Sequence, residues 1–169
     1  MISIRPETAA DRAAVRGANE AAFGRPNEAG LVDALRASAR PLVSLVAVEE
    51  GRVVGHILFS PVTIEGPQGV SAALGLGPMA VRPERQNRGI GSLLVRAGLE
   101  ACSALGETVV VVLGHPHYYP RFGFVPAATK GLRCEYPVPD DVFMVTELVP
   151  GALRGRTGLV KYHPEFARA

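Results

Sequence analysis

An uninterrupted run of β-branched residues, Thr108-Val-Val-Val-Val-Leu113, limits how this chain can fold more than any other feature. No polar residue alternates with the apolar ones, so the strand that the run predicts must be buried on both faces. A helix is expected upstream over 89–105, and an apolar strand with two glycines and a proline over 71–81. Strand, helix and strand then form a right-handed crossover, which makes the two strands parallel neighbours in one sheet.

The other segments add strands and two helices around this crossover. Helices are expected over 10–23 and 27–38, and Thr8 followed by Asp11 is a typical N-terminal cap for the first of them. Further strands are expected over 2–5, 44–49, 52–60, 142–148 and 158–162. Glu50-Gly51 is a hairpin signal. The predicted fold class is α/β (α+β): a single domain over 1–169 whose mixed sheet is flanked by helices.

Composition excludes several classes of protein. A chain of 169 residues can bury a core without disulfides, and we interpret its two cysteines, Cys102 and Cys134, as free thiols. No apolar run reaches the roughly 18 residues that span a bilayer, and the N-terminus does not resemble a signal peptide. We therefore expect a cytoplasmic protein without a membrane partner. The net charge of +2 is spread along the chain without a basic tract, which argues against nucleic acid as a partner.

The segment that carries the chemistry lies between the predicted strand and the predicted helix. The strand ends at Met79-Ala80-Val81, a polar loop follows, and the helix begins at Gly89 and Gly91. Glycines at a helix start leave backbone N–H groups uncovered, so an anion such as a diphosphate can bind there directly. Three arginines are close enough in sequence to add positive charge: Arg82, Arg85 and Arg88. Taken alone, the pattern also fits a tight turn that only lets the helix pack closely.

Two motifs in this region resemble those of a known family. The loop Gln86-x-x-Gly89-x-Gly91 resembles the acyl-CoA loop of the GNAT superfamily of N-acetyltransferases. Tyr118-Tyr-Pro-Arg-Phe-Gly-Phe124 resembles the later motif of that family, in which a tyrosine stands four residues before a Gly-Phe pair. The two motifs define an acyl-CoA-binding core over 74–126, and the segment 136–144 is similar to the YhbS-like branch. The resemblance implies a GNAT-like fold with a splayed central sheet.

The resemblance also implies a reaction and the residues that serve it. It implies an acyltransferase that moves an acetyl group from acetyl-CoA, its co-substrate, to a primary amine of a small molecule or protein. The amine would attack directly in a ternary complex, without a metal. The residues expected to bind acetyl-CoA are Met79, Ala80, Val81, Gln86, Asn87, Arg88, Gly89, Ile90, Gly91 and Ser92. The backbone N–H groups of Met79 and Val81 would polarise the thioester carbonyl.

Tyr119 matches the general acid of the family, because it stands four residues before Gly123. Proton transfer from a phenol of pKa about 10 to a thiolate of pKa about 8.5 costs roughly 2 kcal/mol of free energy. The hydroxyl is therefore expected to stabilise the leaving sulfur by a hydrogen bond, and full proton transfer stays open. The alternative is that the ring only packs, which fits Tyr118 better than Tyr119.

The sequence does not identify the base that takes the proton of the amine. Family members often carry a glutamate on the strand before the CoA loop, but 71–81 contains no acid. Four side chains could act through water: Glu28, His115, Glu135 and Glu147. The missing carboxylate leaves a second function open, a catalytically weak or inactive CoA-binding regulatory module of the same fold. A third is an anion-binding domain unrelated to CoA. The acceptor and the oligomeric state, a homodimer included, also stay open.

Three other patterns favour structural interpretations. Gly75-Leu-Gly-Pro-Met-Ala80 matches a relaxed dinucleotide fingerprint, but its context predicts a strand, and the fingerprint needs a turn that opens a helix. His115-Pro-His117 lacks the spacing of a zinc site and predicts the turn after the buried strand. His56 lies in an apolar strand and is interpreted as a core histidine with its hydrogen bonds satisfied.

Overall fold

The run of β-branched residues forms strand β5 (Val109–Leu113), whose four valines are fully buried. In the computed structural model, which describes residues 1–169, β5 pairs in parallel with β4 (Gly69–Val81). Helix α3 (Ile90–Ala104) connects the two strands. The predicted crossover is confirmed. Gly75 and Ala80 both lie inside β4, as the strand interpretation of the dinucleotide-like pattern requires.

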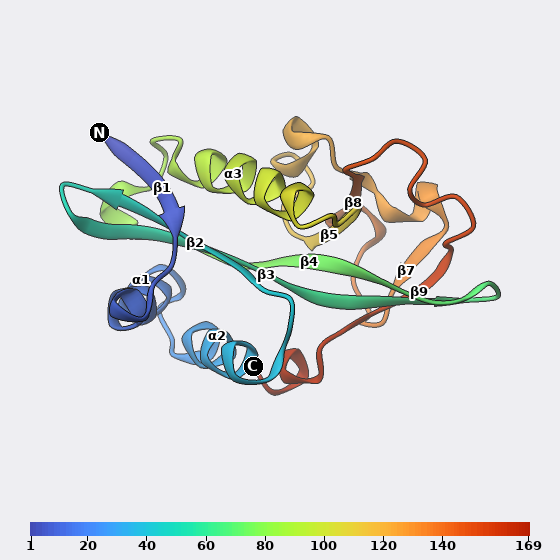
Figure 1. Cartoon of the computed structure of the whole chain (residues 1–169), viewed down its shortest axis with the longest axis horizontal. Helices are drawn as coiled ribbons and strands as arrows, with labels where there is room; N and C mark the ends of the chain where they lie inside the picture. The colour runs from blue at the N-terminus through green and yellow to red at the C-terminus, as the bar shows by residue number, and fades with distance from the viewer.

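One mixed sheet of nine strands contains all the β structure (Figure 1). Its order is β1-β2-β3-β4-β5-β8-β6, and β9 pairs with both β3 and β7. Every pair is antiparallel except β4–β5 and β7–β9. The remaining strands are β1 (Ile2–Pro6), β2 (Val43–Glu49), β3 (Arg52–Gly66), β6 (Val125–Pro126), β7 (Leu132–Cys134), β8 (Phe143–Glu147) and β9 (Gly158–Tyr162).

Helices cover both faces of the sheet. Figure 1 shows α1 (Arg12–Phe23) and α2 (Asn27–Ser38) on one face and α3 on the other, with the C-terminus beside α2. The core under α3 includes Phe59, whose ring lies so close to Gly98 that an added Cβ would be 2.3 Å from its Cε1 atom. None of the helices combines the length and the apolar character needed to cross a membrane. The predicted α/β class, with a mixed sheet flanked by helices, is confirmed.

The sheet is splayed at its centre, as the family resemblance implies. Strands β4 and β5 pair from Leu74 opposite Val110 to Leu76 opposite Val112, and there the pairing ends. Strand β4 continues to Val81 with β3 as its only neighbour. The last part of β4 therefore has one paired edge and one open edge.

Element boundaries differ from the prediction where the chain contains prolines and short turns. The β3–β4 hairpin is longer than expected, because Pro61 continues the strand opposite Leu74 and β9 supports its far half. A 3₁₀ turn, Ala9–Asp11, precedes α1, and the Asp11 carboxylate accepts hydrogen bonds from the N–H and hydroxyl of Thr8. Strands β6 and β7 were not predicted. Cys102 and Cys134 are free, as expected.

His56 is a core histidine with a hydrogen-bond partner on each ring nitrogen, which confirms its structural interpretation. It is fully buried in β3, with Nδ1 3.3 Å from Asn19 Nδ2 and Nε2 2.9 Å from Ser44 Oγ. Burial, and secondly the charge of Arg36, lowers the pKa of His56 from 6.5 to about 3. The ring therefore stays neutral in the folded protein at every pH near neutrality.

We predict that this histidine makes the protein less stable in mild acid. Unfolding restores the pKa of His56 to about 6.5, so below that pH the unfolded chain binds a proton that the folded chain excludes. The free energy of unfolding should fall by about 1.4 kcal/mol per pH unit between roughly pH 6 and 4.5, above the range where most carboxylates titrate. Urea unfolding across this range measures the slope. An NMR titration in which the His56 imidazole protonates near pH 6.5 in the folded protein would contradict the prediction.

Candidate active site

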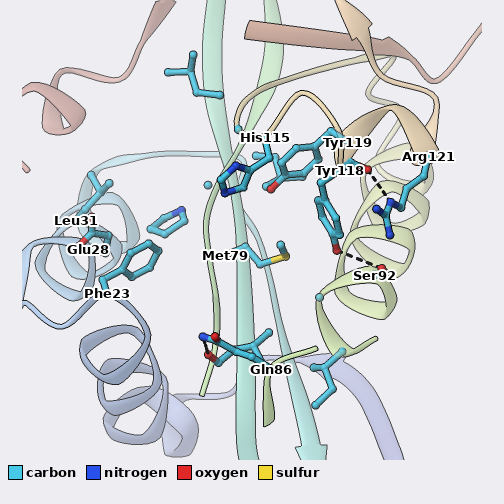
Figure 2. Close-up of a pocket in the computed structure, with 18 of the residues that line it drawn as sticks. Phe23, Glu28, Leu31, Met79, Gln86, Ser92, His115, Tyr118, Tyr119 and Arg121 are labelled. Carbon is cyan, nitrogen blue, oxygen red and sulfur yellow. Dashed lines mark hydrogen bonds between the residues drawn. The ribbon is translucent and has the colours of Figure 1, made fainter. Parts of the chain in front are cut away.

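A cleft of about 950 Å³ passes through the opening between β4 and β5. Residues from both edges of the opening line it, Leu76 and Met79 on β4 and Leu113 on β5. Figure 2 shows Ser92, Tyr118 and Arg121 on one side of Met79, and Phe23, Glu28 and Leu31 from α1 and α2 on the other. Because the two sides belong to opposite faces of the sheet, two ligands can enter separately and meet at the edge of β4.

The N-terminus of α3 presents unpaired backbone N–H groups to this cleft. Gly89 is the N-cap in the left-handed conformation, φ 83°, and no side chain caps the helix. The first hydrogen bond of the helix runs from the N–H of Leu93 to the carbonyl of Gly89, 3.1 Å. The N–H groups of residues 89–92 donate to no protein acceptor. Such a helix start can bind an anion directly through these N–H groups.

The open edge of β4 presents a second set of backbone groups. The N–H of Arg82 donates to the carbonyl of Val54, so it points toward β3. Because backbone groups alternate along a strand, the N–H groups of Met79 and Val81 point the other way, into the cleft. The Gln86 amide donates to the Val81 carbonyl at 2.9 Å from that open side. Two free N–H groups thus lie along the cleft beside the helix start.

Most residues predicted to bind acetyl-CoA line the cleft, and two do not. Those that line it are Met79, Val81, Gln86, Asn87, Gly89, Ile90, Gly91 and Ser92. Ala80 is buried, and its carbonyl points toward Gly55 of β3. Its backbone groups therefore point away from the cleft, opposite to those of Met79 and Val81. Arg88 is exposed to solvent outside the cleft. Neither Ala80 nor Arg88 lines the cleft in this structure, and their part in binding acetyl-CoA stays a prediction.

The three arginines expected to add positive charge lie in different places. Arg82 lies outside the cleft, with Nε 3.4 Å from the Val53 carbonyl. Arg85 lines the cleft, but its Nε donates to the Glu49 carboxylate at 2.5 Å. Arg121, which the sequence analysis did not single out, also lines the cleft. Its guanidinium lies 4.6 Å from the centre of the Tyr118 ring, and its Nε donates to the Tyr118 carbonyl.

Tyr119 combines a packed ring with a hydroxyl in the cleft. The ring is 7% exposed, stands edge-on to Phe124 at 5.7 Å, and leaves so little space at Gly114 that a Cβ there would lie 2.3 Å from Cε2. Its hydroxyl hydrogen-bonds to no protein group and points into the cleft in Figure 2. Burial, together with Tyr118, raises the pKa of Tyr119 to about 12. The hydroxyl is therefore a permanent hydrogen-bond donor at neutral pH.

Tyr118 is oriented differently from its neighbour. Its hydroxyl lies 3.2 Å from Ser92 Oγ, on the side of the helix start. The same hydroxyl would be 3.1 Å from a Cβ added to Gly91. The two tyrosines belong to the turn after β5, and Tyr119 begins a single 3₁₀ turn, Tyr119–Phe122.

Two of the four candidate bases lie in the cleft. Glu28 and His115 line it, and Figure 2 shows the His115 imidazole directed into the space that Tyr119 borders. Glu135 accepts the N–H of Tyr162 at 2.7 Å, and Glu147 accepts that of Leu153 at 2.8 Å; neither lines the cleft. The structure thus reduces the choice to Glu28, His115 and water. No group of three or more His, Cys, Asp or Glu side chains that could hold a metal ion occurs in the structure.

The fold and the cleft together are those of an acyltransferase, with a splayed sheet beside an uncapped helix start. Comparison with known proteins gives the family. A model described as the acetyltransferase (GNAT) domain matches residues 3–127. The chain is 38% identical over 166 residues to the uncharacterized N-acetyltransferase YhbS of Escherichia coli K12, covering 98% of both chains. The chain belongs to the GNAT family of N-acetyltransferases, and its predicted likeness to YhbS is confirmed.

Two solved structures resemble the whole chain. YhbS from Escherichia coli in complex with CoA superposes with a TM-score of 0.89 at 37% identity, covering 99% of this chain and 92% of that one. A GNAT acetyltransferase from Brucella melitensis in complex with acetyl-CoA gives a TM-score of 0.81 at 38% identity, covering 98% of each. The overall fold is therefore that of ligand-binding members of the family.

Proposed function

We propose that this chain transfers the acetyl group of acetyl-CoA to a primary amine by direct attack in a ternary complex. The observation that carries the proposal is the cleft through the sheet, with unpaired N–H groups on one face and a separate entrance on the other. The related proteins from Escherichia coli and Brucella melitensis, which hold CoA and acetyl-CoA, support the identity of the donor. Residues 1–169 would act as one domain with an acyl-CoA-binding core over 74–126.

The half of the cleft on the α3 face, called the donor half below, fits the diphosphate and the pantetheine arm of acetyl-CoA. The backbone N–H groups of 89–92 would hold the diphosphate, in line with the dipole of α3. Arg121 supplies positive charge on the same side, and Arg85, paired with Glu49, also lines the cleft. The open edge of β4 would hold the extended arm by backbone hydrogen bonds. Acetyl-CoA supplies the activated thioester.

The residues at the junction of the two halves support acyl transfer. The N–H groups of Met79 and Val81 would stabilise negative charge that develops on the thioester oxygen. An amine that arrives protonated first gives one proton to Glu28, His115 or water, because only the neutral amine carries the attacking electron pair. The C–N bond then forms as the C–S bond breaks, the electron pair leaves on sulfur, and the attacking nitrogen releases its next proton to the same group or to water. The Tyr119 hydroxyl would donate a hydrogen bond to that sulfur. Complete proton transfer from a phenol of pKa about 12 to a thiolate of about 8.5 is uphill by roughly 5 kcal/mol.

A steady-state assay of CoA thiol release, with acetyl-CoA and a panel of amines both varied, tests the proposal. Direct attack predicts saturable turnover and intersecting double-reciprocal lines, because both substrates must be bound together. Parallel lines would contradict the ternary complex. Tight acetyl-CoA binding without turnover on any amine would instead support the regulatory module, which the lack of an acid in β4 favours.

A further inference from the structure

We infer that the acceptor is a small primary amine carrying an aromatic or compact apolar body, bound on the α1–α2 face of the cleft. The inference rests on the proposed function and names its second substrate. The pocket in question, called the acceptor pocket below, consists of Phe23, Glu28, Leu31, Tyr136, Tyr162 and Phe166.

The charges that line the cleft are divided between its two halves. Glu28 is the only acidic residue among the lining residues, and it lies on the α1–α2 face. The two lining arginines, Arg85 and Arg121, belong to the loop before α3 and to the turn after β5, on the donor side. An anionic donor and a cationic acceptor would thus each meet the complementary charge. A protonated amine is the acceptor that this arrangement favours.

The Glu28 side chain is mostly buried, 14% exposed, and its carboxylate lines the cleft in the ionised form. Arg25 Nε and Nη2 lie 3.0 and 2.5 Å from its oxygens, and this pairing lowers the pKa of Glu28. The side chain of Arg25 is 58% exposed and does not line the cleft. Because Arg25 approaches the carboxylate from the solvent side and does not line the cleft, an ammonium group that enters through the cleft can share the carboxylate with it.

Leu31 and four aromatic rings form the rest of the acceptor pocket. Tyr136 and Tyr162 have ring centres 5.9 Å apart, and Tyr162 and Phe166 5.1 Å apart, which makes a continuous row. Phe23, at the end of α1, is 40% exposed although it is a large apolar residue. An exposed phenylalanine at the mouth of a cleft is typical of a surface that a ligand covers. The amine should therefore carry an aromatic or compact apolar group.

The C-terminal segment favours a small acceptor over a protein. The 3₁₀ turn Pro164–Arg168 packs against α2, and Phe166 contacts both the core under α2 and the core around Tyr162. Figure 1 shows the C-terminus beside α2. Because Phe166 of this packed segment also lines the cleft, we expect an acceptor small enough to bind beside it rather than an extended peptide.

The experiment compares five acceptors at saturating acetyl-CoA: 2-phenylethylamine, butylamine, ethanolamine, spermidine and a peptide with a free N-terminus. Thiol release gives kcat and KM, and mass spectrometry identifies the product. We expect kcat/KM to be highest for 2-phenylethylamine, about tenfold above ethanolamine. Phe23→Leu should reduce the preference for 2-phenylethylamine over butylamine by about three- to tenfold, since it keeps an apolar side chain but removes the ring.

Glu28→Gln tests the carboxylate, and Glu20→Gln is its matched control. The first should raise the KM for 2-phenylethylamine about tenfold and leave the calorimetric Kd for acetyl-CoA unchanged. Glu20 lies on α1 outside the cleft, so its variant should behave as wild type. The inference would be overturned if turnover were highest with spermidine or the peptide. It would also be overturned if Glu28→Gln and Glu20→Gln had the same KM for 2-phenylethylamine. Either result would leave the proposed function standing. No turnover with any amine would overturn both.

Discussion

Gly91→Glu should lower the affinity for acetyl-CoA at least a hundredfold. A Cβ at Gly91 would lie 3.1 Å from the Tyr118 hydroxyl and 3.5 Å from Met79 Cε, so the side chain must enter the donor half of the cleft. There the carboxylate would repel the diphosphate and hold it off the N–H groups of the helix start. Losing two charge-assisted hydrogen bonds of about 1.5–3 kcal/mol each is enough for this change. Calorimetric titration measures it.

The fold should tolerate the substitution, because an acidic residue in the first turn of a helix interacts favourably with its dipole. Gly30→Glu is the matched control: it makes the same change in α2, at an exposed position where nothing lies within 4 Å of an added Cβ. We expect it to bind acetyl-CoA like wild type. An unchanged Kd for Gly91→Glu, with both variants folded by circular dichroism, would show that the diphosphate binds elsewhere.

Tyr119→Phe should lower kcat about 10- to 100-fold and leave the Kd for acetyl-CoA nearly unchanged. The variant keeps the packed ring against Phe124 and removes only the hydroxyl, so the expected loss is one hydrogen bond to the developing thiolate, about 1.5–3 kcal/mol. Because the pKa of Tyr119 is about 12, the hydroxyl should not cause a loss of activity up to about pH 10. A pH profile of kcat checks this second expectation.

Tyr118→Phe is the control for this effect. The Tyr118 hydroxyl is 3.2 Å from Ser92 Oγ beside the helix start. Removing it should raise the Kd for acetyl-CoA by a few-fold at most and leave kcat unchanged. A similar fall in kcat for both variants would mean that the loss is not specific to a hydrogen bond from Tyr119 to the leaving sulfur. An unchanged kcat for Tyr119→Phe would remove that hydroxyl from the mechanism.

The central crossover could be predicted from sequence because its signals are local and unambiguous. Four consecutive valines in β5 fit only a strand buried on both faces, and the apolar spacing of α3 has a helical period. The glycines at 89 and 91 are also a local signal, and they indicate the start of that helix. By contrast, β6 and β7 have two and three residues, which is too short for any period to be read. They form because β8 and β9 offer them free edges.

The side chains of the cleft were harder to predict because they depend on contacts between distant segments. Arg82 and Arg85 are near the loop in sequence, but the carbonyl of Val53 and the carboxylate of Glu49 hold their guanidinium groups. Arg121 reaches the cleft only because the turn after β5 folds back over α3. The acceptor pocket likewise combines the end of α1, the start of α2, the loop after β7, the end of β9 and the turn Pro164–Arg168. No local pattern indicates that these segments meet.

A crystal structure of this chain with bound CoA tests the central claim most directly. We expect the diphosphate oxygens to lie within about 3 Å of backbone nitrogens in the segment 89–92, with the thiol end at the β4–β5 opening near the Tyr119 hydroxyl. A diphosphate bound away from the start of α3, or N–H groups of 89–92 that donate to the protein itself, would contradict it.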